Sequence, residues 1–175
     1  RDIGGYAEIH PCDKQHEVVS LINSSSSNKK IQGIVLSGGP MSVSDFSSPS
    51  IDPQLFELKV PILGICYGMQ AMTKALGGQV ESKGIREFGH ATVRARGHSH
   101  LLSKISDHVN GKGHGLLDVW MSHGDLVTEI PNDFKIICST ENCPIAGIGN
   151  DERKLYGLQF HPEVTHTKQG LQIIK

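Results

Sequence analysis

The chain has 175 residues, of which 37% are hydrophobic and 20% are charged, so it can bury the core of one domain of ordinary globular composition. Its 17 basic and 18 acidic residues leave a net charge of −1, which argues against a binding surface for nucleic acid or an anionic membrane. No apolar run approaches the roughly 20 residues that a membrane-spanning helix needs, and the N-terminus does not resemble a signal peptide. We therefore expect a soluble, cytoplasmic protein.

Short apolar runs alternate with helical patterns in the first half of the chain, which indicates βαβ units and parallel strands. The second half is richer in strands with turn-like joins. Strands are predicted at 6–9, 31–36, 60–65, 91–94, 116–121, 135–138, 145–148 and 155–160, helices at 16–22, 52–58, 69–76 and 169–174, and mobile loops at 24–30 and 110–115. We expect an α/β fold with a mixed, largely parallel central sheet flanked by helices, and functional residues at the carboxyl ends of its strands.

The most informative segment is Gly64-Ile-Cys-Tyr-Gly-Met-Gln70, which follows the apolar run 60–63 and opens a helical pattern. A strand, a cysteine between two glycines and a helix form the pattern of a nucleophile elbow with Cys66 as the nucleophile. Glycines there remove Cβ atoms that would collide with a sharp turn, so the sulfur is expected to point into open space. Unpaired N–H groups at the start of the helix favour a negatively charged sulfur. The alternative is a structural cysteine buried in the core.

A cysteine nucleophile needs a base, and the best candidate is His161, which follows the strand-like run 154–160. Pro162 restricts the backbone at the exit of that strand. Glu163 can accept a hydrogen bond from one imidazole nitrogen, so that the other nitrogen faces the sulfur. The alternative is a solvated histidine beside a solvated glutamate in a surface loop.

The third segment is Ser37-Gly-Gly-Pro40, a turn at the end of an apolar run. Its backbone N–H groups can approach a ligand closely, and together with the amide of Tyr67 they can donate to a developing oxyanion. The chain contains neither of the glycine-rich patterns that bind nucleotide phosphates, so the turn is not predicted to bind phosphate.

These segments occur in the order found in class I, triad-type glutamine amidotransferase domains, and the chain resembles that family over essentially all 175 residues. Within the family it looks like the glutaminase domains of GMP synthetases. The segments that carry this closer resemblance are Arg86-Glu-Phe-Gly89, Asp118-Val-Trp-Met-Ser-His-Gly-Asp125 and Thr165-His-Thr167.

The resemblance implies a mechanism and a set of site residues. Cys66 attacks the carboxamide of glutamine, His161 transfers protons, and Glu163 orients His161; the resulting γ-glutamyl thioester is hydrolysed to glutamate. The amides of Gly39 and Tyr67 hold the oxyanion. The residues that the resemblance places around the substrate are Gly38, Gln70, Ser122, His123, Gly124 and Asp125.

The resemblance also implies a partner, an ATP-pyrophosphatase synthetase domain or subunit. The S-G-G-x-D-S loop of that partner does not occur in this chain, so ATP and Mg²⁺ are expected in the partner and no cofactor is expected here. The chain is expected to be a single amidotransferase domain, without the first strand and helix that the family carries upstream.

No metal site is predicted, because the four cysteines lack zinc-ligand spacing and the histidines His98, His100 and His114 lie in glycine- and serine-containing connections. Other functions are also considered: a glutaminase domain for CTP, anthranilate or carbamoyl phosphate synthesis, an α/β cysteine hydrolase, and an inactive domain that only binds glutamine. The presence of Cys66, His161 and Glu163 together argues against the inactive domain.

Overall fold

The computed structural model describes residues 4–24, 31–82 and 87–175. In chain order, with η for a 3-10 helix, the elements are η1 (Cys12–Lys14), α1 (Gln15–Ser24), β1 (Ile34–Leu36), η2 (Pro53–Glu57), β2 (Ile62–Ile65), α2 (Tyr67–Ala75), β3 (Gln79–Glu81), β4 (Glu87–Ala95), β5 (His108–Val109), β6 (Gly115–His123), β7 (Leu126–Glu129), β8 (Lys135–Ser139), β9 (Gly147–Asn150), β10 (Leu155–Leu158) and α3 (Gly170–Ile174). None of the helices in these ranges has the length and apolar character needed to cross a membrane.

Within the described ranges, eight strands form one sheet in the order β1-β2-β10-β9-β8-β4-β6-β5, and β3 pairs with β7 in a second, two-stranded sheet. In the described part of the large sheet, β2 runs parallel to β1 and β10, and all other pairings are antiparallel. The mixed sheet is confirmed, but the expectation that it is largely parallel is wrong. The short turn between β9 and β10 reverses the chain, so these two consecutive strands pair antiparallel, as β5 with β6 and β8 with β9 also do.

The predicted strand at 6–9 is also wrong. The segment has no regular structure, and Tyr6 and Ile9 are 83% and 97% exposed. A short apolar run forms a strand only when it pairs with a neighbouring strand, and among the described strands β1 is paired with β2 and with no other. The predicted helix at 52–58 is the 3-10 helix η2, whose first turn is capped by the Asp52 carboxylate accepting from the Gln54 N–H at 2.9 Å. Of the loop predicted at 24–30, residues 25–30 lie outside the described part. Of the loop predicted at 110–115, residues 110–114 form the turn between β5 and β6, and Gly115 is the first residue of β6.

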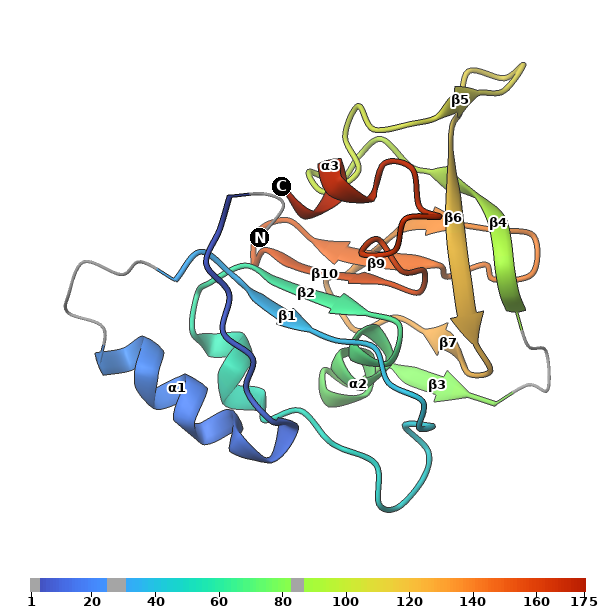
Figure 1. Cartoon of the computed structure of the whole chain (residues 1–175). Coiled ribbons are helices and arrows are strands. Elements are labelled where there is room, and N and C mark those ends of the chain that lie inside the picture. The colour runs from blue at the N-terminus through green and yellow to red at the C-terminus, as the bar shows by residue number, and fades with distance from the viewer. Residues whose placement is uncertain (1–3, 25–30, 83–86) are drawn as a thin grey trace.

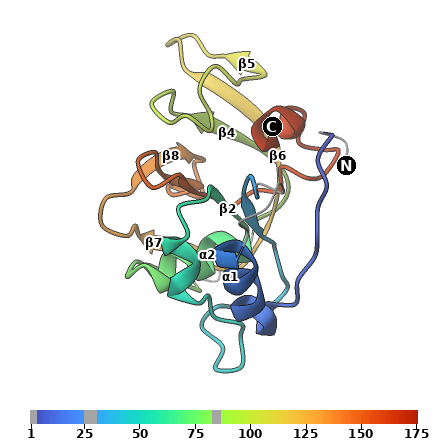
Figure 2. The same ribbon diagram turned by 90° about the vertical axis from the view of Figure 1, so that its left-hand side faces the viewer.

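The sheet has a hydrophobic core on each face. Along β10, the side chain of Leu155 packs into a cluster that includes residues of α1, η2 and α2, whereas Tyr156 and Leu158 pack into a cluster that includes Ile173 of α3. This division follows from the two-residue repeat of a strand. Figure 1 and Figure 2 accordingly show α1 and α2 below β1, β2 and β10, and α3 above them.

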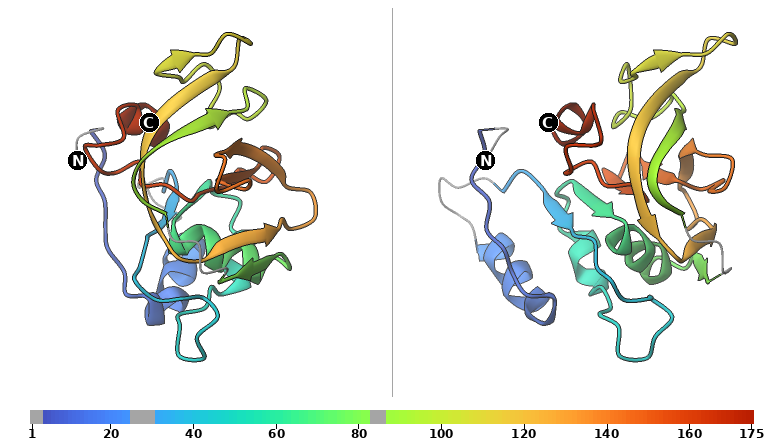
Figure 3. Two further views of the ribbon diagram at one scale, coloured as in Figure 1. Left: turned by 90° about the vertical axis from the view of Figure 1, so that its right-hand side faces the viewer. Right: turned by 45° about the vertical axis from the view of Figure 1, so that its right-hand side comes forward.

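Two features of the architecture position the candidate site. The carboxyl ends of β1, β2 and β10 meet at one edge of the sheet because these strands are parallel and in register. Strands β4 and β6 pair over eight residues each and form a long, curved ribbon (Figure 3). The end of this ribbon brings Ser122 and His123 toward the same edge.

Candidate active site

The three segments predicted from the sequence meet at the carboxyl edge of the parallel strands. The Ser37–Gly39 turn follows β1, Cys66 follows β2, and His161 lies shortly after the end of β10. A Cβ atom placed on Gly38 would lie 3.0 Å from Cε1 of His161 and 3.6 Å from Cβ of Cys66, so both side chains border the turn. Residues far apart in the sequence therefore share one site.

Cys66 occupies a sharp turn between β2 and α2, with φ 51° and ψ −108°. Positive φ is uncommon for a residue other than glycine and requires support from the surroundings. Its N–H donates to the carbonyl oxygen of Leu158 at 2.7 Å. A Cβ on Gly68 would lie 2.1 Å from the backbone oxygen of Leu36, and one on Gly64 would lie 2.7 Å from the backbone of α2. The turn thus requires glycine at both flanking positions, as predicted.

The surroundings of the sulfur differ from the prediction. Cys66 is only 5% exposed, so the expectation that its sulfur points into open space is wrong. The thiol donates to the carbonyl oxygen of Ser122 at 3.3 Å, and the amide nitrogen of Gln159 lies 3.7 Å from the sulfur. Ser122 of β6 and Gln159, which directly follows β10, place these polar groups around the buried sulfur. Cys66 therefore differs from a cysteine packed only against apolar side chains.

His161 is held between Cys66 and Glu163. Its Nδ1 lies 2.6 Å from Oε1 of Glu163. An ionised carboxylate only accepts hydrogen bonds, so Nδ1 carries a proton and donates. The backbone N–H of His161 donates to the carbonyl oxygen of Trp120 in β6 at 3.0 Å, which fixes the chain as it leaves β10. The alternative of an independent, fully solvated His–Glu pair does not describe this arrangement, because the His161 side chain is only 17% exposed.

The contacts of His161 favour its charged form. The hydrogen bond with Cys66 and then that with Glu163 raise the pKa of His161 to about 10, against burial, which alone would lower it. Burial alone would raise the pKa of Glu163, but the hydrogen bond from His161, a backbone hydrogen bond and the charge of His161 together outweigh burial, so the pKa of that carboxyl is lowered. The imidazole therefore holds a proton at neutral pH, next to a sulfur and a carboxylate.

Gln70 lies one turn into α2 and is 3% exposed, so it is not a surface glutamine. Its amide nitrogen donates to the carbonyl oxygen of Asp125 at 3.0 Å and to Oε1 of Gln159 at 3.1 Å. Gln159 in turn approaches Cys66 with its own amide nitrogen. Sequence reasoning missed Gln159; the available signal was a single polar residue, fully buried here, in the apolar run just before His161.

The segment Ser122–Asp125 contributes mainly backbone groups. Ser122 offers its carbonyl oxygen to Cys66, and Asp125 offers its carbonyl oxygen to Gln70. The His123 side chain is 1% exposed and bridges Oε2 of Glu87, at 3.3 Å, to the Asp125 carbonyl oxygen, at 3.2 Å. Burial lowers the pKa of His123, against the influence of Glu87. His123 is thus a buried link between Glu87 and the turn, and each of its ring nitrogens lies within hydrogen-bonding distance of one oxygen.

Asp125 has a second notable feature. It is 7% exposed, and its Oδ2 is buried without a hydrogen-bond partner among the described residues. A buried, unpaired carboxylate oxygen is unfavourable. A ligand that donates to this oxygen would remove that cost. Gly124, between His123 and Asp125, is partly exposed and has no side chain to occupy the space.

The two predicted oxyanion donors lie beside each other. A Cβ on Gly39 would be 3.7 Å from Cγ of Tyr67, so the glycine lies against the tyrosine ring. The Tyr67 hydroxyl donates to the Pro49 carbonyl oxygen at 2.5 Å, which anchors the loop after β1 to the start of α2. Gly39 and Tyr67 are therefore brought to the site with Cys66.

The histidines outside this site form no metal centre within the described ranges. Among the described residues, no group of three or more His, Cys, Asp or Glu side chains could hold a metal ion. His98 is exposed, His100 pairs with Asp151, and His114 hydrogen-bonds to Arg94. Arg86 of the predicted signature lies outside the described residues.

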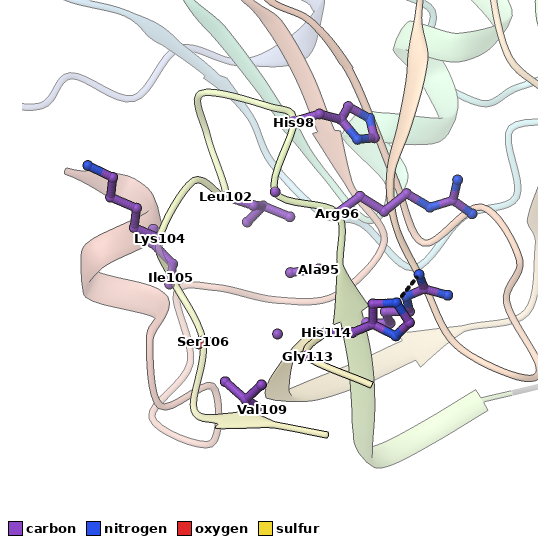
Figure 4. Close-up of a pocket in the computed structure, with 13 residues that line it drawn as sticks. Ala95, Arg96, His98, Leu102, Lys104, Ile105, Ser106, Val109, Gly113 and His114 are labelled. Atoms are coloured by element: carbon purple, nitrogen blue, oxygen red, sulfur yellow. Dashed lines mark hydrogen bonds between the residues drawn. The ribbon is translucent and has the colours of Figure 1, made fainter. Parts of the chain in front are cut away.

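A separate cavity of about 650 Å³ lies between β4 and the loop that precedes β5 (Figure 4). Leu102, Ile105 and Val109 are among its lining residues, and none of the predicted site residues lines it. In Figure 4, Arg96 and His98 extend to one side and Lys104 extends to the other. The charged groups therefore do not converge on a common point, and the cavity lacks the polar constellation expected of an active site.

Known proteins are similar to the chain at several levels. The family described as glutamine amidotransferase class-I matches residues 1–175. The glutamine-hydrolysing GMP synthase of Methylococcus capsulatus is 54% identical over all of the chain, and that of Legionella pneumophila (strain Corby) is 53% identical. The chain spans only 32% of the length of these relatives.

Solved structures are also similar to the chain in fold and sequence. The crystal structure of a protein from Thermoplasma acidophilum, described as a subunit of GMP synthase, has a TM-score of 0.75 and 28% identity, covering 99% of this chain and 80% of that one. A glutamine amidotransferase from Methylobacillus flagellatus has a TM-score of 0.60 and 26% identity, covering 76% of this chain and 52% of that one. The chain belongs to the class I glutamine amidotransferase family.

Proposed function

We propose that the chain is the glutaminase part of a GMP synthase, which hydrolyses L-glutamine and supplies ammonia for the amination of XMP. The observation that carries this proposal is the connected series Cys66, His161 and Glu163 at the carboxyl edge of parallel strands. The 54% identity to a GMP synthase over the whole chain favours this reaction over CTP, anthranilate or carbamoyl phosphate synthesis. It also favours an amidotransferase over an α/β hydrolase of esters or peptides.

In the proposed reaction, the turn at Cys66 acts as a nucleophile elbow, which its left-handed backbone supports. In the reacting form, His161 holds the proton of the Cys66 thiol, and the resulting thiolate attacks the carboxamide carbon of glutamine to form a tetrahedral intermediate. His161 gives a proton to the departing ammonia, and a γ-glutamyl thioester remains on Cys66. His161 then accepts a proton from water as the water attacks the thioester; the C–S bond breaks, glutamate is released, and the Cys66 thiolate is restored beside the protonated imidazole. Glu163 holds the imidazole through Nδ1, so Nε2 is the atom that exchanges protons.

The remaining site residues are proposed to bind the substrate and to stabilise the oxyanion. The backbone amides of Gly39 and Tyr67 are the proposed oxyanion donors, and each such donor is typically worth about 3 kcal/mol in the barrier. Gly38 leaves room for the substrate beside the imidazole. The unpaired Oδ2 of Asp125 supports a contact with the α-ammonium group of glutamine.

Gln70, Ser122 and Gly124 complete the substrate site in this proposal. Gln70 and Ser122 already contact the groups around the sulfur, and Gly124 lies in the same turn as Ser122. His123 was predicted to bind substrate, but its engaged ring nitrogens support a role in holding the turn.

The proposed partner is an ATP-pyrophosphatase synthetase domain or subunit, which would use ATP and Mg²⁺ to activate XMP. This chain would act as one amidotransferase domain without a cofactor of its own, in the cytoplasm. The relatives, about three times as long as the matched segment, support a partner of this kind.

The test compares two cysteine variants. Cys66→Ala is expected to abolish glutamate release from glutamine, whereas Cys12→Ser, at an exposed cysteine in η1, is expected to retain it. Hydrolysis by a folded Cys66→Ala variant would refute the nucleophile. Addition of the synthetase part with XMP and ATP is expected to accelerate hydrolysis, and a failure to do so would refute the assignment to GMP synthesis.

A further inference from the structure

The loop after His161, residues 162–170, lies along β6 through a series of side-chain contacts. The Thr167 side chain is at its centre and is 4% exposed. Its hydroxyl donates to the carbonyl oxygen of His161 at 2.6 Å and accepts from the backbone N–H of Trp120 at 3.2 Å. The hydroxyl therefore donates one hydrogen bond and accepts another, and in this way links two backbone groups.

The arrangement resembles an interrupted strand pair. In an antiparallel sheet, two opposite residues of a hydrogen-bonded pair exchange two N–H···O bonds. Here the N–H of His161 donates directly to Trp120, but the return bond from Trp120 passes through the hydroxyl of Thr167. The hydroxyl thus lies between the His161 carbonyl oxygen and the Trp120 N–H of β6, and each of these two backbone groups keeps a hydrogen-bond partner. The chain cannot continue as a ladder beyond this point, because Pro162 has no N–H.

The position of Thr167 is itself fixed by the loop. The Thr167 N–H donates to the Val164 carbonyl oxygen at 3.1 Å, and the Gly170 N–H donates to the Thr167 carbonyl oxygen at 3.0 Å. A Cβ on Gly170 would lie 1.9 Å from the carbonyl oxygen of Pro162, so the loop closes tightly on its own start.

The neighbours of Thr167 bind the same strand. The ring of His166 lies 4.4 Å from that of Trp120, between centroids. The Lys168 ammonium donates to the Asp118 carboxylate at 2.6 Å, which lowers the pKa of Asp118 together with the hydrogen bond from His108. Three consecutive residues of the loop are therefore attached to β6, and Glu163 lies in the same loop.

We infer that Thr167 is a positioning residue for the glutaminase reaction, because its hydroxyl sets the placement of the His161–Glu163 pair relative to Cys66. The inference rests on the proposed function. It assigns a role to one hydroxyl that touches neither the sulfur nor the imidazole ring. It also predicts that the hydroxyl, rather than the volume of the side chain, is what the reaction needs.

The test uses three variants in a Cys12→Ser background, so that alkylation reports on Cys66. Thr167→Val keeps the shape and removes the hydroxyl, and Thr167→Ser keeps the hydroxyl. Thr128→Val is the matched control, because the Thr128 hydroxyl oxygen is also buried but has no hydrogen-bond partner in the described part of the chain. Glutamate release at varied glutamine concentration and the pH dependence of iodoacetamide reaction at Cys66 are measured for each.

Thr167→Val is expected to lower kcat about tenfold, in line with a misplacement of less than 1 Å, with little change in KM and with a shifted pH profile of alkylation. Thr167→Ser and Thr128→Val are expected to behave like the parent. Parent kcat and alkylation profile in Thr167→Val would overturn the inference, as would equal losses in the Val and Ser variants. If Thr167→Val does not fold, Thr167→Ala takes its place with the same criteria.

A His161→Asn variant separates the two proposals. Loss of glutamate release in His161→Asn together with parent activity in Thr167→Val would overturn only the role of Thr167. Parent activity in His161→Asn would overturn the proposed function itself.

Discussion

Glu163→Gln tests the electrostatic part of the candidate site with little change in shape. Glutamine can still accept a hydrogen bond from Nδ1 of His161 at the position where Glu163 accepts one at 2.6 Å. The substitution removes the negative charge and allows a flipped amide to donate instead. We therefore expect the imidazole to be held less firmly and its charged form to be less stable.

The structure sets the size of the effect. A hydrogen bond to a charged group contributes about 1.5 to 3 kcal/mol. The Glu163 side chain is 45% exposed, so solvent screening reduces this contribution. A loss of about 1 to 1.5 kcal/mol in the transition state corresponds to a kcat lower by a factor of about ten. Steady-state glutamate release, measured against glutamine concentration, gives this factor directly.

The same variant has a defined pH signature. The pKa of His161 is raised from 6.5 to about 10, so the associated stability is fully present below pH 6.5 and is lost as the pH rises toward 10. In Glu163→Gln, the pKa of His161 should fall but remain elevated, because the hydrogen bond with Cys66 is the larger cause. An NMR titration of the imidazole measures this fall. Parent kcat with an unchanged titration, or inactivity equal to that of Cys66→Ala, would refute the reasoning.

Two further predictions concern glycines. Gly38→Ala places a Cβ 3.0 Å from the His161 ring, so we expect about tenfold slower glutamate release in a folded protein, whereas Gly39→Ala makes only ordinary contacts and should stay near the parent rate. Equal rates for the two would contradict this. Gly68→Ala places a Cβ 2.1 Å from the backbone oxygen of Leu36, and should lower the free energy of unfolding by about 1 to 3 kcal/mol. Urea unfolding measures it, and an unchanged midpoint would show that the close approach is not required.

The parallel part of the fold was predictable because its strands and helices have local signals. Strand-like runs followed by glycine-containing turns mark β1 and β2, and helical periodicity marks α2. The antiparallel part was not, because the choice of partner for β8 and β9 depends on contacts that short apolar runs do not specify. The segment at 6–9, which has no regular structure, shows a related limit, since an apolar pattern alone does not create a neighbouring strand.

The candidate site was predictable where a residue has a local pattern. Cys66 lies between two glycines, and His161 precedes a proline and a glutamate. Gln159 and Thr167 have no such pattern. Gln159 contacts Cys66, 93 positions away. Thr167 donates to the carbonyl oxygen of His161, just before its own loop, and accepts from β6, 47 positions away. The contacts of both residues exist only in the folded chain, where polar groups that are distant in sequence come together.

The two kinds of strand pairing contribute differently to the site. The parallel strands β2 and β10 lead to Cys66 and His161 at one edge of the sheet. Both residues lie where the chain leaves the sheet, so neither side chain is held by its own strand alone. The antiparallel ribbon of β4 and β6 extends past that edge and supplies the missing supports: the Ser122 carbonyl oxygen for the thiol, and Trp120 for His161 and Thr167. The parallel strands therefore bring Cys66 and His161 together, and the antiparallel strand β6 contributes to how they are held.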